Sequence, residues 1–501
     1  MVTVTMRMGR PSASRLLQKA LLPSASGHGR HRSHRSLSTN NKPRGNTARP
    51  KRLLALAIET SCDDTCVAVI EKYGGCARIR LNTKITSDNR KFGGVEPITT
   101  VESHTTEIAH LVESALRFLP EVDPGADDRT KVLSFREPHP VTRRRPDIIC
   151  VTRGPGMTAN LAVGLTMAKA LSVAWQVPLV AVHHMQAHAL TSRLVSAIKQ
   201  PWPPETPEGT SNMDPLLQPA FPFLSLLVSG GHTQLLLSRS VTSHSILAET
   251  PNAAIGDMLD KCARAILPPS LLAKAQDIMY GAQLEAFAFA GTQDRTTTTP
   301  YDYGHWYTAP AKRADEIRPY VSPTHGWGLT PPLSERRDMT FDFSGLSGQA
   351  RAIAQRNPAM DAPERRELAR QVMRLAFEHL ASRVLFALDK ASGTAEEETT
   401  PTTLVVAGGV ASNGFLRHVL RAMLDARGHA GVAVSCPPAA LCIDNAAMIG
   451  WAGAEMYEAG WRSSLRVRPI RKWSMDAGAG EDGSGGIMGV DGWLRVGEED
   501  R

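Results

Sequence analysis

Short apolar runs alternate with amphipathic segments along the chain, a pattern that predicts a mixture of strands and helices. Residues 53–58 and 66–70 are expected to form two buried strands joined by a polar turn. Further on, residues 146–152 and 177–182 have the pattern of strands, and the small and apolar residues 159–173 between them have that of a helix. Alternation of strands and helices is typical of an α/β fold.

The same order of elements recurs in the second half of the sequence. Residues 221–228 and 234–238 predict another hairpin with a polar turn, and residues 403–407 predict a strand that ends in a glycine-rich turn. A helix at 414–425 and a last strand at 431–434 follow. Although the two halves barely resemble each other in sequence, their order of elements predicts a duplicated α/β fold, with two similar lobes and a central cleft between them.

The repeat divides the chain into four parts. We expect a leader at 1–52, a first lobe at 53–220, a second lobe with insertions at 221–476, and a disordered tail at 477–501 that is rich in glycine and acidic residues.

The leader holds the positive charge that gives the chain its net charge of +8. Residues 1–52 contain 12 Lys and Arg and no Asp or Glu, which leaves 45 basic and 49 acidic residues in the remainder. An Arg- and Ser-rich leader without acids is typical of a mitochondrial transit peptide, and a disordered basic tail is the alternative. If the folded part binds nucleic acid, it must use a local patch.

Composition argues against a membrane protein and against a disulfide-bonded protein. No apolar run reaches the roughly 18 residues that a membrane-spanning helix needs, so we expect no membrane partner. The seven cysteines include no Cys-x-x-Cys pair and indicate free thiols in a reducing compartment.

Two histidines mark a candidate metal site. His184 and His188 lie four apart at the start of a predicted helix, which places both imidazoles on one face. The alternatives are a solvated pair, or one ligand and one hydrogen-bonded core histidine. Asp444 opens the corresponding helix of the second half, so the duplication makes it a reasonable third ligand.

Glycine-rich turns mark a candidate phosphate site. Backbone N–H groups in Ser229-Gly230-Gly231 can approach an anion because no Cβ intervenes, and Gly408-Gly409 precedes a helix N-terminus. Each turn alone is weak evidence, since tight turns need glycine anyway. Together they indicate binding of a phosphate-bearing group.

Nine motifs occur in the order of one known family. They are Ile58–Thr65, Gly93–Val95, Gly154–Gly156, His184-xxx-His188, Ser229–Thr233, Gly256–Lys261, Phe343–Leu346, Gly408–Asn413 and Asp444–Ile449. From about residue 53 to 476 the chain resembles the tRNA adenosine threonylcarbamoyltransferases, the TsaD family once called O-sialoglycoprotein endopeptidases.

The resemblance implies a duplicated, two-lobed actin/hexokinase/Hsp70-like (ASKHA) fold and a reaction. A threonylcarbamoyl group passes from threonylcarbamoyl-AMP to N6 of the adenosine at position 37 in tRNAs that read ANN codons, and AMP leaves. The resemblance also implies a separate synthase that supplies threonylcarbamoyl-AMP, and one divalent metal ion per subunit, for which the ligands do not choose among zinc, iron and manganese.

The resemblance assigns roles to particular residues. It makes His184, His188 and Asp444 metal ligands, and it gives Asp63 a catalytic or orienting role. Positions that match those holding the threonylcarbamoyl-AMP are Leu227, Val228, Ser229, Gly230, Gly231, Asp260, Gly281 and Asn413.

Departures from the common bacterial pattern favour one branch of the family. Gln186 stands where many members have Glu, and Tyr280-Gly281-Ala282 stands where Pro-Gly-Gly is usual, which makes Gly281 the least secure assignment. With the transit-like leader, Gln186 and the Gly256–Lys261 motif resemble the mitochondrial branch. That branch is expected to act in the mitochondrial matrix as a homodimer, without accessory complexes.

Three other functions compete with the transferase. A metallopeptidase of the His-Glu-x-x-His type needs Glu directly after the first histidine, where this chain has Met185. A non-enzymatic ATP-binding scaffold of the same fold has no use for two histidines and an aspartate. A sugar kinase needs a base that the sequence does not identify.

Overall fold

A computed structural model of the chain describes residues 52–122, 132–135, 141–202, 216–273, 280–291, 301–392, 400–479 and 485–495. The predicted transit peptide therefore lies almost entirely outside the described residues. No described helix is both long and apolar enough to cross a membrane.

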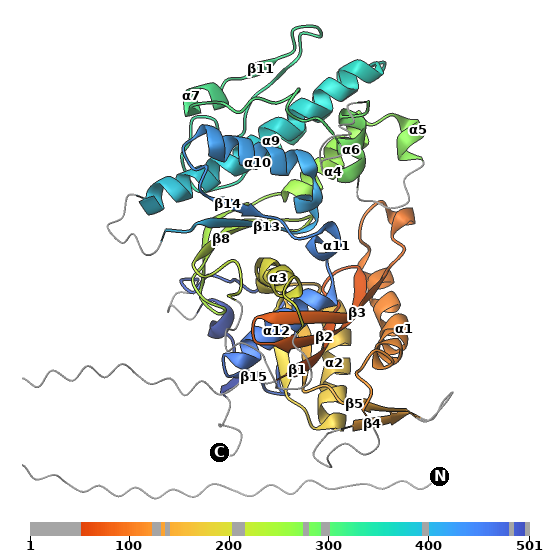
Figure 1. Cartoon of the computed structure of the whole chain (residues 1–501). Coiled ribbons are helices and arrows are strands. Elements are labelled where there is room, and N and C mark those ends of the chain that lie inside the picture. Colours follow the sequence, from red (N-terminus) through yellow and green to blue (C-terminus); the bar gives the residue numbers. More distant parts are fainter. Residues whose placement is uncertain are drawn as a thin grey trace, which may run out of the picture. The chain divides into compact units, whose positions relative to one another are not determined.

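The first sheet has seven strands, and its core consists of three antiparallel strands followed by two parallel ones (Figure 1). Its order is β16 (Trp493–Arg495), β15 (Trp461–Ser463), β7 (Leu179–His183), β6 (Ile148–Gly154), β1 (Leu53–Glu59), β2 (Asp64–Tyr73) and β3 (Cys76–Thr86). The strands β1, β6 and β7 are buried throughout, which explains their continuous apolar runs.

The second sheet repeats this core. Its order is β10 (His244–Glu249), β9 (Thr233–Ser238), β8 (Phe223–Val228), β13 (Thr403–Ala407) and β14 (Ala433–Ser435). Here too three strands that follow one another in the sequence, β8, β9 and β10, are antiparallel neighbours, and β13 and β14 run parallel to β8. The shared order confirms the predicted duplicated α/β fold.

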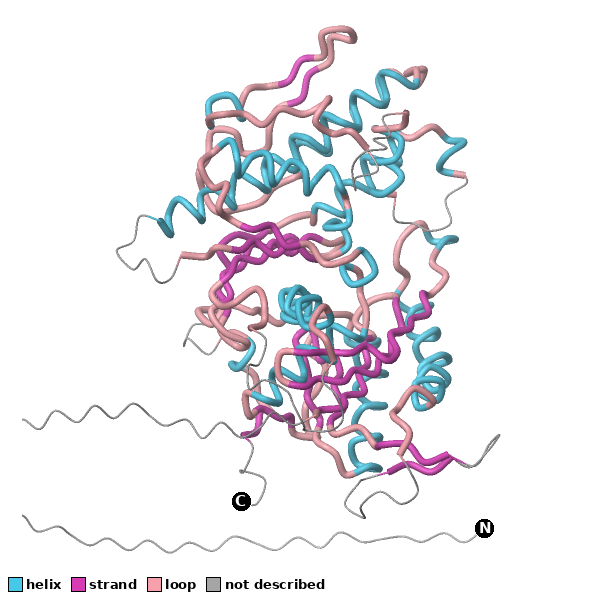
Figure 2. The backbone as a smooth tube through the Cα atoms, viewed as in Figure 1, coloured by secondary structure: helices cyan, strands magenta, loops and turns pink. Residues whose placement is uncertain are grey.

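Helices cover both faces of each sheet (Figure 2). On the first sheet, α1 (Pro97–Leu116) and α2 (Thr158–Trp175) pack against one face of β1, where Leu54 and Leu56 point, and α12 (Ala446–Glu458) packs against the other. The core on that second face also contains α3 (His184–Ile198) and residues of β8 and β13. One continuous apolar core therefore joins the two lobes.

The outer face of the second sheet carries the longest helix. That face is covered by α4 (Ile255–Ile266), α6 (Gly281–Ala288), α8 (Ser344–Arg356), α9 (Ala362–Ser392) and α10 (Gly414–Ala426). The short elements are β4 (Val132–Phe135), β5 (Val141–Arg144), α5 (Pro269–Leu272), α7 (Arg313–Glu316), β11 (Tyr320–Val321), β12 (Gly328–Leu329), α11 (Ala439–Cys442), η1 (Arg90–Phe92), η3 (Gly409–Ser412) and η4 (Ile487–Gly489).

The C-terminal region differs from its prediction. The elements α12, β15 and β16 come last in the sequence but belong to the first sheet and its covering layer. Part of the tail that was predicted to be disordered is ordered, because Ile487 is fully buried and Trp493 pairs with Ser463 in the sheet. The glycine- and acid-rich composition of the tail predicted disorder because its few apolar residues, such as Ile487 and Trp493, form no recognisable strand or helix pattern.

Candidate metal and anion-binding site

The metal candidate begins at the junction of β7 and α3. His183 is the N-cap of α3, and its Nδ1 accepts hydrogen bonds from the backbone N–H groups of Met185 and Gln186 at 3.2 and 3.4 Å. Its Nε2–H donates to the backbone carbonyl of Trp473 at 2.9 Å, which fixes the tautomer. The helix that starts here places His184 and His188 one turn apart on the same face.

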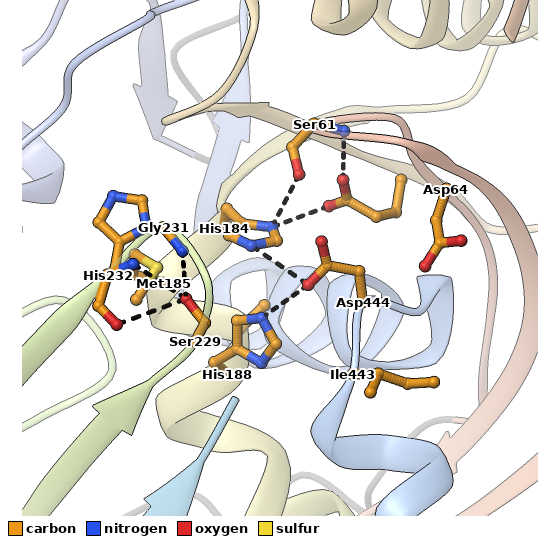
Figure 3. A network of polar contacts seen from close by, with 12 residues as sticks. Ser61, Asp64, His184, Met185, His188, Ser229, Gly231, His232, Ile443 and Asp444 are labelled. Atoms are coloured by element: carbon orange, nitrogen blue, oxygen red, sulfur yellow. Dashed lines mark hydrogen bonds and ion pairs between the residues drawn. The ribbon is translucent and has the colours of Figure 1, made fainter. Parts of the chain in front are cut away.

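Asp444 meets the two histidines from the second half of the sequence (Figure 3). Its Oδ1 lies 3.1 Å from Nε2 of His188 and 3.5 Å from Nε2 of His184. The next residue, Asn445, caps α12 by accepting from the N–H of Met448 at 3.0 Å. The structure thus brings together the three residues that the sequence predicts as ligands, at the point where the chain returns to the first lobe.

Glu59 completes the site and was not predicted. The Nδ1–H of His184 donates to Oε2 of Glu59 at 3.1 Å, and the Glu59 side chain also accepts from Ser61 N–H and the Thr152 hydroxyl. Glu59 is 1% exposed. The one available signal was an acid at the end of an otherwise apolar strand, because a buried carboxylate needs partners.

Charges within this group control its protonation. Burial opposes the charged form of His184, but Asp444 and Glu59 outweigh burial and raise its pKa to about 9. Burial likewise opposes ionised Asp444, yet His184 and His188 hold its pKa well below its usual value. Burial raises the pKa of Glu59, but the charge and hydrogen bond of His184 outweigh burial and lower it. A cation at the triad would therefore take the place of protons.

The donor set fits a divalent metal ion. Two imidazole nitrogens and one carboxylate oxygen lie within 4.8 Å of one another, and Glu59 holds the His184 tautomer whose Nε2 can bind a cation. Such a set suits zinc, iron or manganese and leaves coordination positions for another ligand. The Asp444 side chain is 25% exposed, so the group is open to solvent on that side.

Asp63 has no ion-pair partner among the described residues, unlike its neighbour. It is 6% exposed, and burial together with the charge of Asp64 raises its pKa. Asp64 itself pairs with Lys84 at 2.6 Å and accepts from the Thr86 hydroxyl. Asp63 is therefore the carboxyl group of this turn that remains available.

The turn Ser229-Gly230-Gly231 exposes bare backbone. A Cβ added to Gly230 or Gly231 would meet no atom within 4 Å, and neither residue has a left-handed φ. Neither packing nor conformation therefore explains these glycines. By contrast, a Cβ on Gly256 would lie 2.7 Å from the Ser229 carbonyl oxygen, so Gly256 is required where α4 packs on the turn. The N–H of Gly231 donates to Oγ of Ser229 at 3.3 Å, and that of Gly230 has no partner among the described residues. Backbone N–H groups with no Cβ beside them suit an anion.

His232 directly follows this turn and is drawn together with the triad in Figure 3. Its backbone N–H donates to Oγ of Ser229 at 3.0 Å. Burial, together with the charges of His184 and His188, lowers the pKa of its imidazole to about 4. His232 therefore stays neutral beside the candidate metal site.

The other residues predicted to bind the donor lie on the second lobe. Leu227 and Val228 are buried in β8, so only their backbone groups could contact a ligand. Asn413 is the N-cap of α10, and its side chain accepts from Leu416 N–H at 2.9 Å. Gly281 donates its N–H to Oδ1 of Asp260 at 2.8 Å. Burial raises the pKa of Asp260 to about 6 despite that bond.

Comparisons of the sequence with known proteins match one family. The family model described as tRNA N6-adenosine threonylcarbamoyltransferase, TsaD, matches residues 139–204 and 209–451. The chain is 33% identical over 455 residues to a protein of Schizosaccharomyces pombe named "tRNA N6-adenosine threonylcarbamoyltransferase, mitochondrial", covering 88% of this chain and 89% of the relative.

A bacterial relative and a solved structure give further matches. The tRNA N6-adenosine threonylcarbamoyltransferase of Brucella ovis is 31% identical over 424 residues, 84% of this chain and 95% of its own length. The crystal structure of T. kodakarensis HypF matches with a TM-score of 0.38 at 12% identity, covering 83% of this chain and 50% of that chain, which is too weak a likeness to support any inference.

Proposed function

The chain belongs to the tRNA N6-adenosine threonylcarbamoyltransferase family, and we propose that its His184–His188–Asp444 group and its second-lobe turns form the site of that transfer. The protein is a transferase that modifies tRNA, as the match over most of its length to a named mitochondrial transferase supports. The non-enzymatic scaffold, the peptidase and the kinase are not favoured.

In the proposed reaction, N6 of adenosine 37 attacks the carbamoyl carbon of threonylcarbamoyl-AMP. A carbon–nitrogen bond forms, the bond from that carbon to the phosphate oxygen breaks, and AMP leaves with the bonding electrons. The amine loses one proton. Because the donor is an activated anhydride, the protein must chiefly orient the two substrates and stabilise developing negative charge.

We assign the donor to the second lobe. Backbone N–H groups at Gly230 and Gly231 would receive its phosphate, with Gly231 exchanging its 3.3 Å bond to Oγ of Ser229 for one to the anion. Asp260, Gly281 and Asn413 would hold the remainder of the nucleotide. What supports this assignment is the bare backbone of the turn, which neither packing nor φ requires. Val228 and Leu227 would contribute backbone groups at the end of β8.

We assign a metal ion to the first lobe. His184, His188 and Asp444 would hold one zinc, iron or manganese ion, whose chemistry would be Lewis-acid polarisation of an oxygen of the donor. Glu59 would keep His184 in its binding tautomer. Asp63 would orient the adenosine amine or accept its proton.

We further propose where and with what the protein acts. Its relative's mitochondrial name and the acid-free leader support action in mitochondria. There the protein would act in the matrix, on tRNAs that read ANN codons. A separate synthase would supply threonylcarbamoyl-AMP. The active form would be a homodimer that needs no accessory complex.

One reconstitution tests this function. Full-length protein would be incubated with threonine, bicarbonate, ATP, a threonylcarbamoyl-AMP synthase and unmodified ANN-reading tRNA, and nucleosides would be analysed by mass spectrometry. Threonylcarbamoyladenosine formed without other proteins is the expected result. Product that requires added accessory proteins would reject self-sufficiency, and no product with folded protein in either mixture would reject the function.

A further inference from the structure

A run of exposed cations lies outside the residues assigned to the reaction. We define the basic segment as residues 466–472, whose charged members are Arg466, Arg468, Arg471 and Lys472. All four are exposed, and none of their side chains has a hydrogen-bond or ion-pair partner among the described residues. Their charge is therefore available to a ligand.

Apolar residues hold the basic segment against the first lobe. Val467 is buried within the core that includes α1 and α2, and Ile470 packs against the core shared by both lobes. The following Trp473 is buried in that shared core, and its ring contacts the His183 ring in a tilted arrangement with the centroids 4.6 Å apart. Apolar side chains thus point inward while the cations between them point outward. The segment presents charge on a fixed backbone.

The backbone of this segment is bonded to the wall of the candidate metal site. Ile470 N–H donates to the Arg153 carbonyl at 2.8 Å, and Gly156 N–H donates to the Arg471 carbonyl at 3.3 Å. Gly156 in turn packs so closely on Ser61 that a Cβ would lie 2.8 Å from its carbonyl oxygen. The Ser61 hydroxyl is 3.3 Å from Nδ1 of His184. Three contacts, through Gly156 and Ser61, therefore connect Arg471 to the predicted metal ligand His184.

The second basic run, Arg143-Arg144-Arg145, is occupied within the protein. Arg143 pairs with Glu121 at 3.0 Å, Arg144 pairs with Asp147 at 2.6 Å, and Arg145 donates to a backbone carbonyl. Since the chain beyond the leader has 45 basic and 49 acidic residues, no general positive field can replace a local patch.

We propose that the basic segment binds the phosphates that flank the adenosine when tRNA enters the site. The proposal rests on the proposed function, because it requires an RNA whose base reaches the His184–His188–Asp444 group. Arginine and lysine contacts to phosphate position a nucleic acid without reading its sequence. Such contacts suit an enzyme that acts on several tRNAs.

A pair of matched double variants tests the proposal in the full-length protein. Arg471→Gln/Lys472→Gln removes two cations from the basic segment, and Arg78→Gln/Arg117→Gln removes two exposed cations on β3 and after α1 that have no acidic partner among the described residues. The dissociation constant for unmodified tRNA would be measured by fluorescence anisotropy over a series of salt concentrations. The basic-segment variant should bind about tenfold more weakly, with a salt slope reduced by about two, while the control matches wild type.

Each outcome decides the proposal. Wild-type affinity and slope in the basic-segment variant, or an equal loss in the control, would overturn it, as would a wild-type protein that does not bind tRNA. Unchanged melting temperature and metal affinity would show that the variant is folded with its site intact. If wild-type protein binds tRNA as expected but forms no threonylcarbamoyladenosine, the proposed function fails separately.

Discussion

The carboxylate of Glu59 lies 3.1 Å from Nδ1 of His184, and the opposite ring nitrogen of the same imidazole faces Asp444 at 3.5 Å. A ring held in this way keeps its proton on Nδ1 and directs Nε2 at a cation between the side chains. Glu59 comes from β1 and Asp444 from the far end of the sequence, so the fold itself assembles this relationship.

Removing the charge of Glu59 should weaken metal binding. In Glu59→Gln the amide can still accept from Ser61 N–H, but the imidazole loses its carboxylate partner, and metal affinity should fall by about 10- to 100-fold. Competition with a chromogenic chelator measures this, and Glu113→Gln on the exposed face of α1 is the matched control. Equal affinities of Glu59→Gln and wild type would mean that Glu59 does not orient the ligand.

Substitution of Gly231 should impair donor binding but leave the stability of the protein nearly unchanged. Gly231→Ala places a methyl group in open space, so the free energy of unfolding should change by less than about 1 kcal/mol. The methyl group would obstruct an anion at the backbone, so the KM for threonylcarbamoyl-AMP should rise. Steady-state kinetics and thermal unfolding measure the two effects.

Gly256→Ala provides the contrast to Gly231→Ala. Its Cβ would collide with the Ser229 carbonyl, so we expect a loss of about 1–3 kcal/mol in stability. If Gly231→Ala instead lost stability and kept its KM, the turn would be a packing feature and the phosphate assignment would be wrong.

Much of the fold follows from apolar runs, and the exceptions have physical causes. The strand β3 was not predicted, because the charged Arg78, Arg80 and Lys84 at alternate positions leave too few apolar residues for a clear strand pattern. The helix α9 was not predicted either. Its buried residues lie on several of its faces, so no narrow apolar stripe reveals its period.

The metal ligands were predictable from the spacing of two histidines and from the duplicated order of elements. Two histidines four apart and the matching place of Asp444 in the second half pointed to one group, which the structure assembles. Glu59 was not predictable in this way, since it contacts His184 rather than being one of the spaced ligands, and it follows an apolar run without a repeated spacing. The open space around Gly230 and Gly231 is equally absent from the sequence, because it depends on what the rest of the chain leaves unfilled.

Stability should depend on pH through Asp260. Burial raises its pKa from 3.8 to about 6, so the folded state binds more protons than the unfolded state between these values. Its contribution to stability therefore falls as pH rises through this window and stays low above it. Asp260→Asn keeps an acceptor for Gly281 N–H and removes the ionisation.

The comparison of Asp260→Asn with wild type isolates this contribution. From about pH 4 to about pH 7, the free energy of unfolding of the variant relative to wild type should increase by up to about 3 kcal/mol. Urea denaturation at the two pH values measures it. A difference between the proteins that does not change with pH would show that Asp260 titrates at an ordinary pKa.

The most direct test of the account combines metal content with tRNA modification in one set of proteins. Wild type, His188→Ala and the exposed control His110→Ala would be assayed for bound metal by mass spectrometry of the protein sample and for threonylcarbamoyladenosine in reconstituted tRNA. We predict about one divalent ion per chain and product in wild type and control, with both lost in folded His188→Ala. Full product from His188→Ala that holds no metal would contradict a metal-dependent transfer at this site.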